Sequence, residues 1–537
     1  MINRMTTVGR TLWRLLAVFL IVWDGGGCGS RGEPASSKSL VSRRPLGPTV
    51  SQVGSVVHSQ PITLQGYGLV GGLPGTGSAE CPPQIKEYLR RYAQSQASGD
   101  RSIDVDKLIN SRQTAVVYLE AMLPAAAAKS DLFDVKVTAF GREPTLSLEG
   151  GWLYTADINP KGYTRVPGRA FASADGPVYI DKVSSQSADK KSGYVLGGGR
   201  LLESLQVVLV LRQPDFRTAS IVRDLVNDRF GPQTGKALSS NQIELQVPLA
   251  YRHQRWRFFS LVEALYLDQS PDVLQGCVTT LVRELAVNPE KAPREIALEA
   301  IGPASLAGLG VLLQSSDEQV RLSAARCALN LGSPRGLAPL VAIAFDPGST
   351  RRQEAANALA ASGPVQEVVA ALQRLLEDAD PDVALTAYEE LLKVDPMAVP
   401  SVAVSGGFIL DQVPGGPNKA IVASRSGRSR IALFGQIACR SGQFLELEDG
   451  LITLDSRAGD VFLLATRKHP TRGSVMGPLR CSYKLHDLIQ ILCSEPAAER
   501  PGQGGLGLSY SDMLALLKKA CDSGFVDADF WAGPLPR

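Results

Sequence analysis

The sequence predicts an α+β fold, in which β-rich mixed regions at both ends of the mature chain are interrupted by an α-helical repeat segment. Leu205–Leu211 is a nearly continuous apolar run, followed by an amphipathic helix beginning near Pro214 and the alternating segment Ile243–Val247. This order of strand, helix and strand is typical of a helix that covers one face of a sheet. From residue 271 to 400 the sequence becomes rich in alanine and leucine, and helical patterns recur at intervals of about 30 residues.

The chain has 537 residues, too many for one hydrophobic core, and changes in composition divide it. The predicted regions are a signal peptide (1–28), a polar linker (29–60), an α+β region (61–267), helical repeats (268–400), a β-rich region (401–475) and C-terminal helices (476–537). The repeats resemble HEAT repeats, whose helix pairs bury their faces by stacking on neighbours. A plain helical bundle is the alternative interpretation. Further strands are predicted at Asp134–Phe140 and Phe444–Leu454.

The N-terminus has the pattern of a targeting segment. Three arginines precede the apolar run Leu15–Trp23, which is too short to span a bilayer as a helix of the mature protein. Small residues before Cys28 resemble the end of a bacterial lipoprotein signal, although Gly25 stands where a leucine is usual. We therefore expect export, with lipidation of Cys28 and ordinary signal cleavage nearby as open alternatives.

Composition and motifs exclude several functional classes. A net charge of +3 argues against nucleic acid as the main partner. The basic and aromatic residues of Tyr251–Tyr266 are interpreted as a helix that buries its aromatic side chains, rather than as a grip on nucleic acid or glycan. No HExxH, CxxC or GxSxG motif occurs, and Ser187-x-x-Lys190 lacks the partner motifs of a serine acyl-enzyme site. The sequence therefore predicts no enzyme, no cofactor and no metal site.

Eight cysteines are present. Cys277 and Cys327 fall on apolar helix faces and are predicted to be buried thiols. Four more stand between residues 439 and 521, where one or two disulfides are compatible with an exported protein. Their pairing cannot be deduced from the sequence.

The stretch Leu64–Ser78 holds six glycines, at positions 66, 68, 71, 72, 75 and 77. Gly66-x-Gly68-x-x-Gly71 matches the dinucleotide fingerprint, but that fingerprint requires an immediate helix and an acidic residue after a second strand. Further glycines and Pro74 follow instead, so nucleotide binding is rejected. We expect tight turns or positive φ at several of these glycines.

The same stretch resembles the glycine-rich signature of the flagellar P-ring protein family. The matching residues are Gly66, Tyr67, Gly68, Gly72, Gly75 and Gly77, whereas Gly71 and Ser78 depart from the family pattern. Later segments that fit the family's order contain Asp134, Gly150, Gly151, Asp215 and Phe216. The resemblance covers about 61–267 and 481–531 and has no counterpart of the helical block, which is therefore interpreted as an insertion.

The resemblance implies a structural subunit of the flagellar basal body that assembles into the P ring around the rod, in the periplasm, as a bushing for motility. It implies partners: further copies of the chain, rod and outer-membrane ring proteins, and peptidoglycan. The alternative is an envelope lipoprotein that reuses the fold as a scaffold and presents the HEAT-like block to a protein partner. We expect the glycines of Ile62–Ser78 to supply a thin edge for ring contacts, or else only internal turns.

Overall fold

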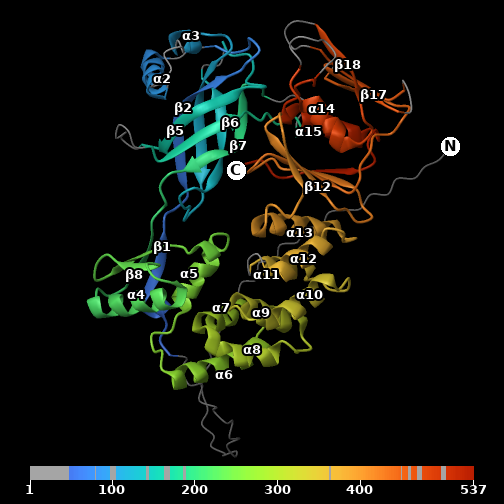
Figure 1. Cartoon of the computed structure of the whole chain (residues 1–537). Helices are drawn as coiled ribbons and strands as arrows, with labels where there is room; N and C mark the ends of the chain where they lie inside the picture. Colours follow the sequence, from blue (N-terminus) through green and yellow to red (C-terminus); the bar gives the residue numbers. More distant parts are fainter. Residues whose placement is uncertain are drawn as a thin grey trace, which may run out of the picture. The chain divides into compact units, whose positions relative to one another are not determined.

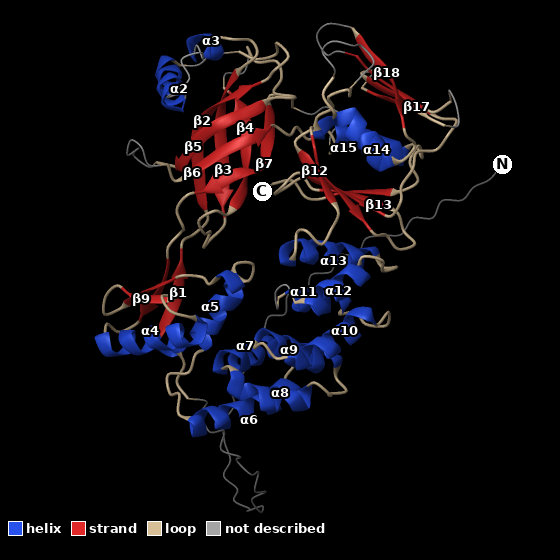
Figure 2. Cartoon of the chain, in the orientation of Figure 1, coloured by secondary structure: helices blue, strands red, loops and turns tan. Residues whose placement is uncertain are grey.

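The computed structural model describes residues 47–536 apart from residues 79, 81, 97–104, 141–143, 163–169, 185–188, 362–364, 449, 458–460, 469–473 and 497–503. The expected signal peptide, Cys28 and residues 29–46 of the expected linker lie outside the described residues, as does Ser187. Figure 1 shows the chain coloured along the sequence, and Figure 2 shows its helices and strands.

Six strands close into an antiparallel barrel in the order β2-β3-β4-β7-β6-β5 (Figure 2). They are β2 (Ile62–Gly71), β3 (Ala115–Leu123), β4 (Leu132–Ala139), β5 (Trp152–Pro160), β6 (Ala172–Pro177) and β7 (Ser192–Leu201). Alternating apolar side chains such as Val135 and Ile158 are fully buried and form the core of the barrel. Helices α2 (Pro83–Gln96) and α3 (Val105–Ile109) pack on the outside of the barrel through Leu89 and Ile109.

A second sheet has the strand order β1-β8-β10-β9. Its region comprises α1 (Val50–Val53), β1 (Gly54–His58), β8 (Val207–Leu211), α4 (Phe216–Phe230), β9 (Gly235–Ala237), β10 (Gln242–Leu245), η1 (Leu249–Tyr251) and α5 (Arg255–Ala264). The expected order of strand, helix and strand is confirmed, because α4 buries Val222 and Val226 in the core of this sheet. Helix α5 buries Phe258 and Phe259, as the interpretation of its aromatic residues expected.

The predicted linker (29–60) is wrong for its last residues. Strand β1 pairs antiparallel with β8, and Val56 lies opposite Leu209. In Figure 1 the dark-blue β1 accordingly lies among the green elements of a much later part of the chain. A five-residue strand with few large apolar residues gives a weak sequence signal, since its stability comes from the partner strand.

Helices fill the middle of the chain (Figure 1). They are α6 (Pro271–Val287), α7 (Ala292–Ile301), η2 (Pro303–Ser305), α8 (Leu306–Leu312), α9 (Glu318–Asn330), η3 (Pro334–Gly336), α10 (Leu337–Phe345), α11 (Arg352–Ala360), α12 (Gln366–Leu375) and α13 (Pro381–Val394). The expected helical middle segment is confirmed, whereas its kinship with HEAT repeats stays a prediction. Among the described residues no single helix is long and apolar enough to cross a membrane. The pair Ala292–Ile301 and Pro303–Leu312 reaches the required length and apolar composition only when its two helices are added together, and these are bent by 115°.

The C-terminal part contains two sheets, ordered β11-β12-β14-β13-β19 and β15-β16-β17-β18, and two helices. These elements are β11 (Ser401–Val404), β12 (Phe408–Val413), β13 (Ala420–Ala423), β14 (Arg430–Phe434), β15 (Phe444–Leu447), β16 (Ile452–Asp455), β17 (Leu463–Lys468), β18 (Val475–Cys481), α14 (Leu485–Cys493), α15 (Tyr510–Asp522) and β19 (Asp529–Ala532). One hydrophobic core joins both sheets to both helices, and it includes Leu410, Leu454 and Leu514. The regions 401–475 and 476–537, which the sequence predicted as separate, therefore share this core.

Two local expectations in the C-terminal part are corrected. Phe444–Leu454 is a hairpin of β15 and β16 rather than one strand, because the backbone turns at Glu448 and Gly450, whose φ values are 49° and 82°. Among the described cysteines, those at 439, 481, 493 and 521 are free thiols, so the disulfides considered there do not form. Cys277 and Cys327 are buried thiols, as expected.

Candidate functional site

Strand β2 carries the first half of the glycine-rich stretch. Both of its edges are hydrogen-bonded to neighbouring strands of the barrel. It pairs with β3 along its length and with β5 near both of its ends. A Cβ on Gly66 would lie 2.5 Å from the carbonyl oxygen of Asp157, and one on Gly68 would lie 2.8 Å from Leu153 Cδ1. These glycines let β5 approach β2 closely, so residues 62–71 have no unpaired strand edge, and a role of Ile62–Ser78 in ring contacts stays a prediction.

The second half of the stretch, Gly72–Ser78, is a loop seated on the turn before β3. The backbone N–H of Gly77 donates to the carbonyl oxygen of Arg112 at 2.9 Å. A Cβ on Gly77 would lie only 2.1 Å from the carbonyl oxygen of Thr114. No other residue type fits at position 77 without moving the backbone.

Two further glycines of this loop are required by conformation rather than by space. Gly72 and Gly75 have φ values of 76° and 88°, in the region that favours glycine, and a Cβ on either would meet nothing within 4 Å. Between Gly75 and Gly77, the carbonyl oxygen of Thr76 accepts from the backbone N–H of Leu146 at 2.8 Å. The expected tight turns are therefore present in the loop.

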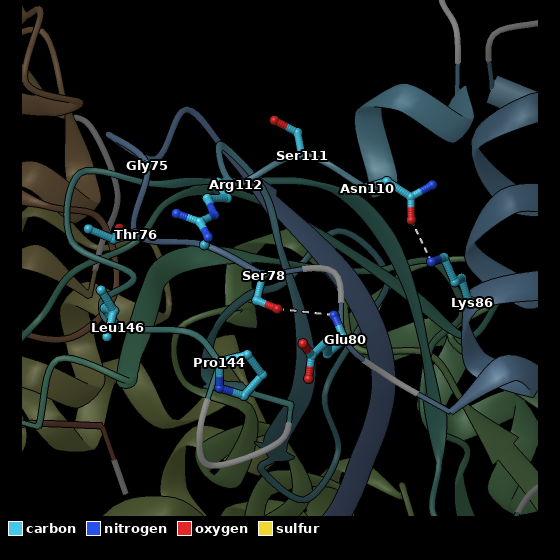
Figure 3. Close-up of a pocket in the computed structure, with 11 residues that line it drawn as sticks. Gly75, Thr76, Ser78, Glu80, Lys86, Asn110, Ser111, Arg112, Pro144 and Leu146 are labelled. Atoms are coloured by element: carbon cyan, nitrogen blue, oxygen red, sulfur yellow. Dashed lines mark hydrogen bonds between the residues drawn. The ribbon is translucent and has the colours of Figure 1, made fainter.

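The loop borders an open cavity of about 850 Å³ at the end of the barrel (Figure 3). The cavity is also lined by Glu80, Lys86 of α2, the turn Asn110–Arg112, Pro144 and Leu146. Lys86 donates to the side-chain oxygen of Asn110 at 2.5 Å, and the backbone N–H of Glu80 donates to Ser78 Oγ at 3.2 Å. The lining offers charges of both signs and hydroxyl groups, which suit binding of a polar surface.

The dinucleotide fingerprint does not form its usual structure. Gly66 to Gly71 lies wholly within strand β2, so these glycines do not make the turn from a strand into a helix that holds a pyrophosphate. Within the described parts of the chain, no group of three or more histidine, cysteine, aspartate or glutamate side chains could hold a metal ion.

Gly150 and Gly151 lie beside the same end of the barrel. Gly150 has a φ of 72°, and a Cβ on Gly151 would lie 2.4 Å from Val70 Cγ1. The turn before β5 thus rests against the end of β2. The structure therefore brings these two glycines together with those of the signature stretch.

Tyr67 and Asp134 occupy other faces of the barrel. Tyr67 packs on Tyr118, with ring centroids 5.8 Å apart, in the cluster that α2 and α3 cover. The carboxylate of Asp134 on β4 accepts from the backbone N–H groups of Gly197 at 2.6 Å and Gly427 at 2.9 Å. Burial raises the pKa of Asp134, and these two hydrogen bonds oppose the rise.

Asp215 and Phe216 belong to the second sheet and not to the barrel. Asp215 caps α4, accepting from the backbone N–H groups of Arg217 at 3.2 Å and Thr218 at 2.9 Å. Hydrogen bonds from Thr218 lower the pKa of Asp215. The side chain of Phe216 is 76% exposed, so this pair has a capping role and a surface position.

Comparison with known proteins shows what this part of the chain is similar to. The family model described as flagellar P-ring protein matches residues 49–274, from α1 through the barrel and second sheet into α6. Residues 49–274 of the chain are therefore similar to the flagellar P-ring protein family. We refer to residues 49–274 as the P-ring region.

Individual relatives agree with the family match. The flagellar P-ring protein of Albidiferax ferrireducens is 30% identical over 237 residues, 41% of this chain and 60% of the relative. That of Thermotoga maritima is 31% identical over 226 residues, 39% of this chain and 63% of the relative. That of Campylobacter lari is 29% identical over 259 residues, 45% of this chain and 70% of the relative. The chain thus spans about 60% of the length of the relatives first matched.

The family match begins before the expected boundary at residue 61 and includes β1, the strand that pairs with β8 in the second sheet. It ends at residue 274, so helices α7–α13 and the C-terminal sheets lie outside it. The resemblance expected at 481–531 therefore stays a prediction.

Sequence reasoning missed a buried ion cluster that joins the P-ring region to the C-terminal part. Lys182 Nζ lies 2.7 Å from Asp512 Oδ1 and 2.8 Å from Glu448 Oε1, and it also contacts Glu149. Arg467 reaches Asp512 at 3.3 Å. The side chains of Lys182 and Asp512 are 6% and 1% exposed. No short-range pattern in the sequence signals a pair that is separated by 330 positions.

Lys182 and Asp512 stabilise each other in their charged forms. Burial by itself would lower the pKa of Lys182, but the attraction of Asp512 and Glu149 outweighs it and raises the pKa. Burial would raise the pKa of Asp512, and the attraction of Lys182 and Arg467 lowers it instead. Lys182 therefore remains charged at the junction, between carboxylates from both parts of the chain.

Proposed function

We propose that the chain is a structural subunit of the flagellar basal body P ring, which assembles around the rod in the periplasm as a bushing for motility. The observation that carries the proposal is the family match of residues 49–274. The closed barrel supports it, because each of its strands is paired on both sides and its core is filled by buried side chains. Such a body keeps its shape under load, which a bushing requires.

Ring assembly requires a contact between two different patches on neighbouring copies. Since β2 offers no free edge, we place one patch at the end of the barrel, where exposed apolar side chains surround the glycine loop. Leu146, Trp152 and Tyr154 are 67%, 50% and 43% exposed. Trp152 pairs with Gly71, and a Cβ on Gly71 would touch the ring of Tyr154. Exposed apolar groups of this size are suited to subunit contacts.

The further partners in this proposal are rod proteins, outer-membrane ring proteins and peptidoglycan, as the resemblance implies. The proposed location is the periplasm, reached through the expected signal, with Cys28 as a lipid attachment point if lipidation occurs. Mass spectrometry of the protein recovered from cells is expected to find a mature N-terminus at or near Cys28. Recovery of Met1 or Leu15 in that protein would contradict export through this signal.

Trp152→Asp tests the proposed assembly patch. We expect the variant to remain a soluble monomer, to fail to form rings in electron micrographs, and to leave cells that lack the native gene unable to swim. The matched control is Leu249→Asp, because Leu249 of η1 is 84% exposed. Normal rings formed by the Trp152 variant would show that this patch is not a subunit contact. Normal swimming after deletion of the gene would remove the flagellar function itself.

The second candidate function is an envelope scaffold whose helical block binds a protein partner. The observation that favours it is that α7–α13 lie outside the family match. Stacked helices of this kind commonly present a protein-binding surface. A deletion strain that swims normally, with the helical block cross-linked to one envelope protein in the parent strain, would support this function over the first.

A further inference from the structure

A cavity of about 900 Å³ lies where the P-ring region, α13 and the β13–β14 hairpin meet. Ionic and hydrogen-bonded contacts hold its walls together. Arg255 of α5 reaches Asp131 of the barrel at 2.6 Å. The backbone N–H of Gly427 in the β13–β14 hairpin donates to Asp134 of β4 at 2.9 Å. The cavity is therefore lined by elements that are fixed to each other by tertiary contacts.

Six arginine and lysine side chains line this cavity, against the two carboxylates of Asp131 and Glu389. Three of the six cations are neutralised by carboxylates. Lys393 pairs with Glu390 at 2.6 Å, Arg430 with Asp411 at 2.5 Å and Arg425 with Asp181 at 3.4 Å. Asp131 is itself occupied by Arg255.

The other three cations are Arg200, Arg252 and Arg428. Across the described part of the chain, none of their side chains forms an ion pair or donates a hydrogen bond, and all three residues are exposed. They come from strand β7, from the turn before α5 and from the β13–β14 hairpin. Three regions of the chain thus each contribute one unneutralised guanidinium to a single cavity, which leaves an excess of positive charge there.

A neighbouring cavity of about 460 Å³ extends this positive surface. It shares Arg252, His253 and Lys393 with the larger cavity. Burial lowers the pKa of His253, and the charges of Arg252, Lys393 and Arg255 lower it further. The lowered pKa of His253 indicates a positive electrostatic field around the residues that the two cavities share.

We propose that the larger cavity binds a small, multiply charged anion whose carboxylate or phosphate groups are held by Arg200, Arg252 and Arg428. The planar guanidinium fork matches the geometry of both groups and donates to them bidentately. Leu385 and Leu392 of α13 also line the cavity, and apolar walls strengthen a charge contact by excluding water. The proposal does not depend on ring assembly, because the site lies within one chain.

Calorimetric titration of the whole mature chain at low salt tests the site, with citrate as the carboxylate probe and pyrophosphate as the phosphate probe. We expect at least one probe to bind with one-to-one stoichiometry. Added sodium chloride should weaken its affinity. Each of Arg200→Gln, Arg252→Gln and Arg428→Gln is expected to weaken that binding about tenfold or more. Preference for one probe identifies which of the two anionic groups the site takes.

Arg335→Gln is the matched control, since Arg335 is exposed on the helical block and does not line the cavity. The control should bind the probe as the unaltered chain does. The bound probe should also raise the melting temperature of the unaltered chain and of the control, but not of the triple glutamine variant. Binding of neither probe, or binding by the triple variant as tight as that of the unaltered chain, would overturn the proposal. Either result would leave the ring-forming function untouched.

Discussion

Lys182 Nζ lies 2.7 Å from Asp512 Oδ1, although 330 positions separate the two residues in the chain. Lys182 follows strand β6 of the barrel, and Asp512 stands in the first turn of α15, where it closes a capping box with Ser509. One buried cation thereby fastens the P-ring region to the C-terminal helix. Tyr179 and Val183 beside Lys182 belong to the C-terminal hydrophobic core, which reinforces the same junction.

Lys182→Met is expected to destabilise the protein by about 3–5 kcal/mol, because it leaves buried carboxylates without their central cation. Urea unfolding followed by circular dichroism measures the loss. Arg440→Met is the matched control, since its pair with Asp527 has side-chain exposures of 53% and 68%. Exposed pairs contribute little, so the control should unfold close to the unaltered chain. Equal midpoints for both variants would show that the buried cluster does not hold the junction.

Gly66→Ala is expected to lower the free energy of unfolding by about 1–3 kcal/mol, because the added Cβ would lie 2.5 Å from the carbonyl oxygen of Asp157. Gly276→Ala is the control. Gly276 lies in α6 with nothing within 4 Å of its Cβ position, so alanine there should stabilise by about 0.5–1 kcal/mol. Thermal unfolding of both variants compares the two effects. A Gly66 variant as stable as the parent would show that β5 can move away from β2.

The junction between α5 and the helical block is expected to weaken in acid. Glu295 is buried and lies 2.6 Å from both Arg257 and Arg326. Burial would raise its pKa, but the two arginines outweigh burial and hold the pKa below its ordinary value of 4.5. The unfolded chain therefore takes up this proton more readily than the folded one. The contribution of Glu295 to stability is complete above about pH 4.5 and is lost as the pH falls through the lowered folded-state pKa.

Glu295→Gln measures this contribution. The variant should be less stable than the parent at pH 7, and its stability should fall less steeply below pH 4.5, because it lacks the titrating carboxylate. Urea unfolding at a series of pH values gives both slopes. If the free energy of unfolding depended on pH in the same way for parent and variant, the loss of stability in acid would come from other carboxylates.

Deletion of residues 271–400 is expected to destroy cooperative folding of the flanking parts. On one side, Arg257 of α5 would lose its buried partners Glu295 and Glu299. On the other side, Phe434 of β14 packs in the hydrophobic cluster of α9–α13 and would become exposed. This outcome differs from what an independent insertion would give, because insertions with few boundary contacts can be removed. A soluble deletion variant with a cooperative melt would show that the block folds apart from the rest.

Much of the P-ring region followed from the sequence alone, because its signals are local. The apolar run Leu205–Leu211 and the apolar stripe of the helix that follows Pro214 specify a strand and a helix by their periods, whatever their partners. The glycines of Leu64–Ser78 marked a tightly constrained backbone, and the motif they form resembled one family, which the match of residues 49–274 supports. The helical middle segment followed in the same way from the recurrence of alanine and leucine.

Only the tertiary structure decided what those glycines do and which parts of the chain are joined. Gly66 and Gly68 lie against the neighbouring strand β5, and closure of the barrel depends on pairing between strands that lie far apart in sequence. The partners of Lys182 and the three unneutralised arginines of the large cavity come from elements brought together by packing. Charge pairing depends on distance in space, and no periodicity along a chain carries that information.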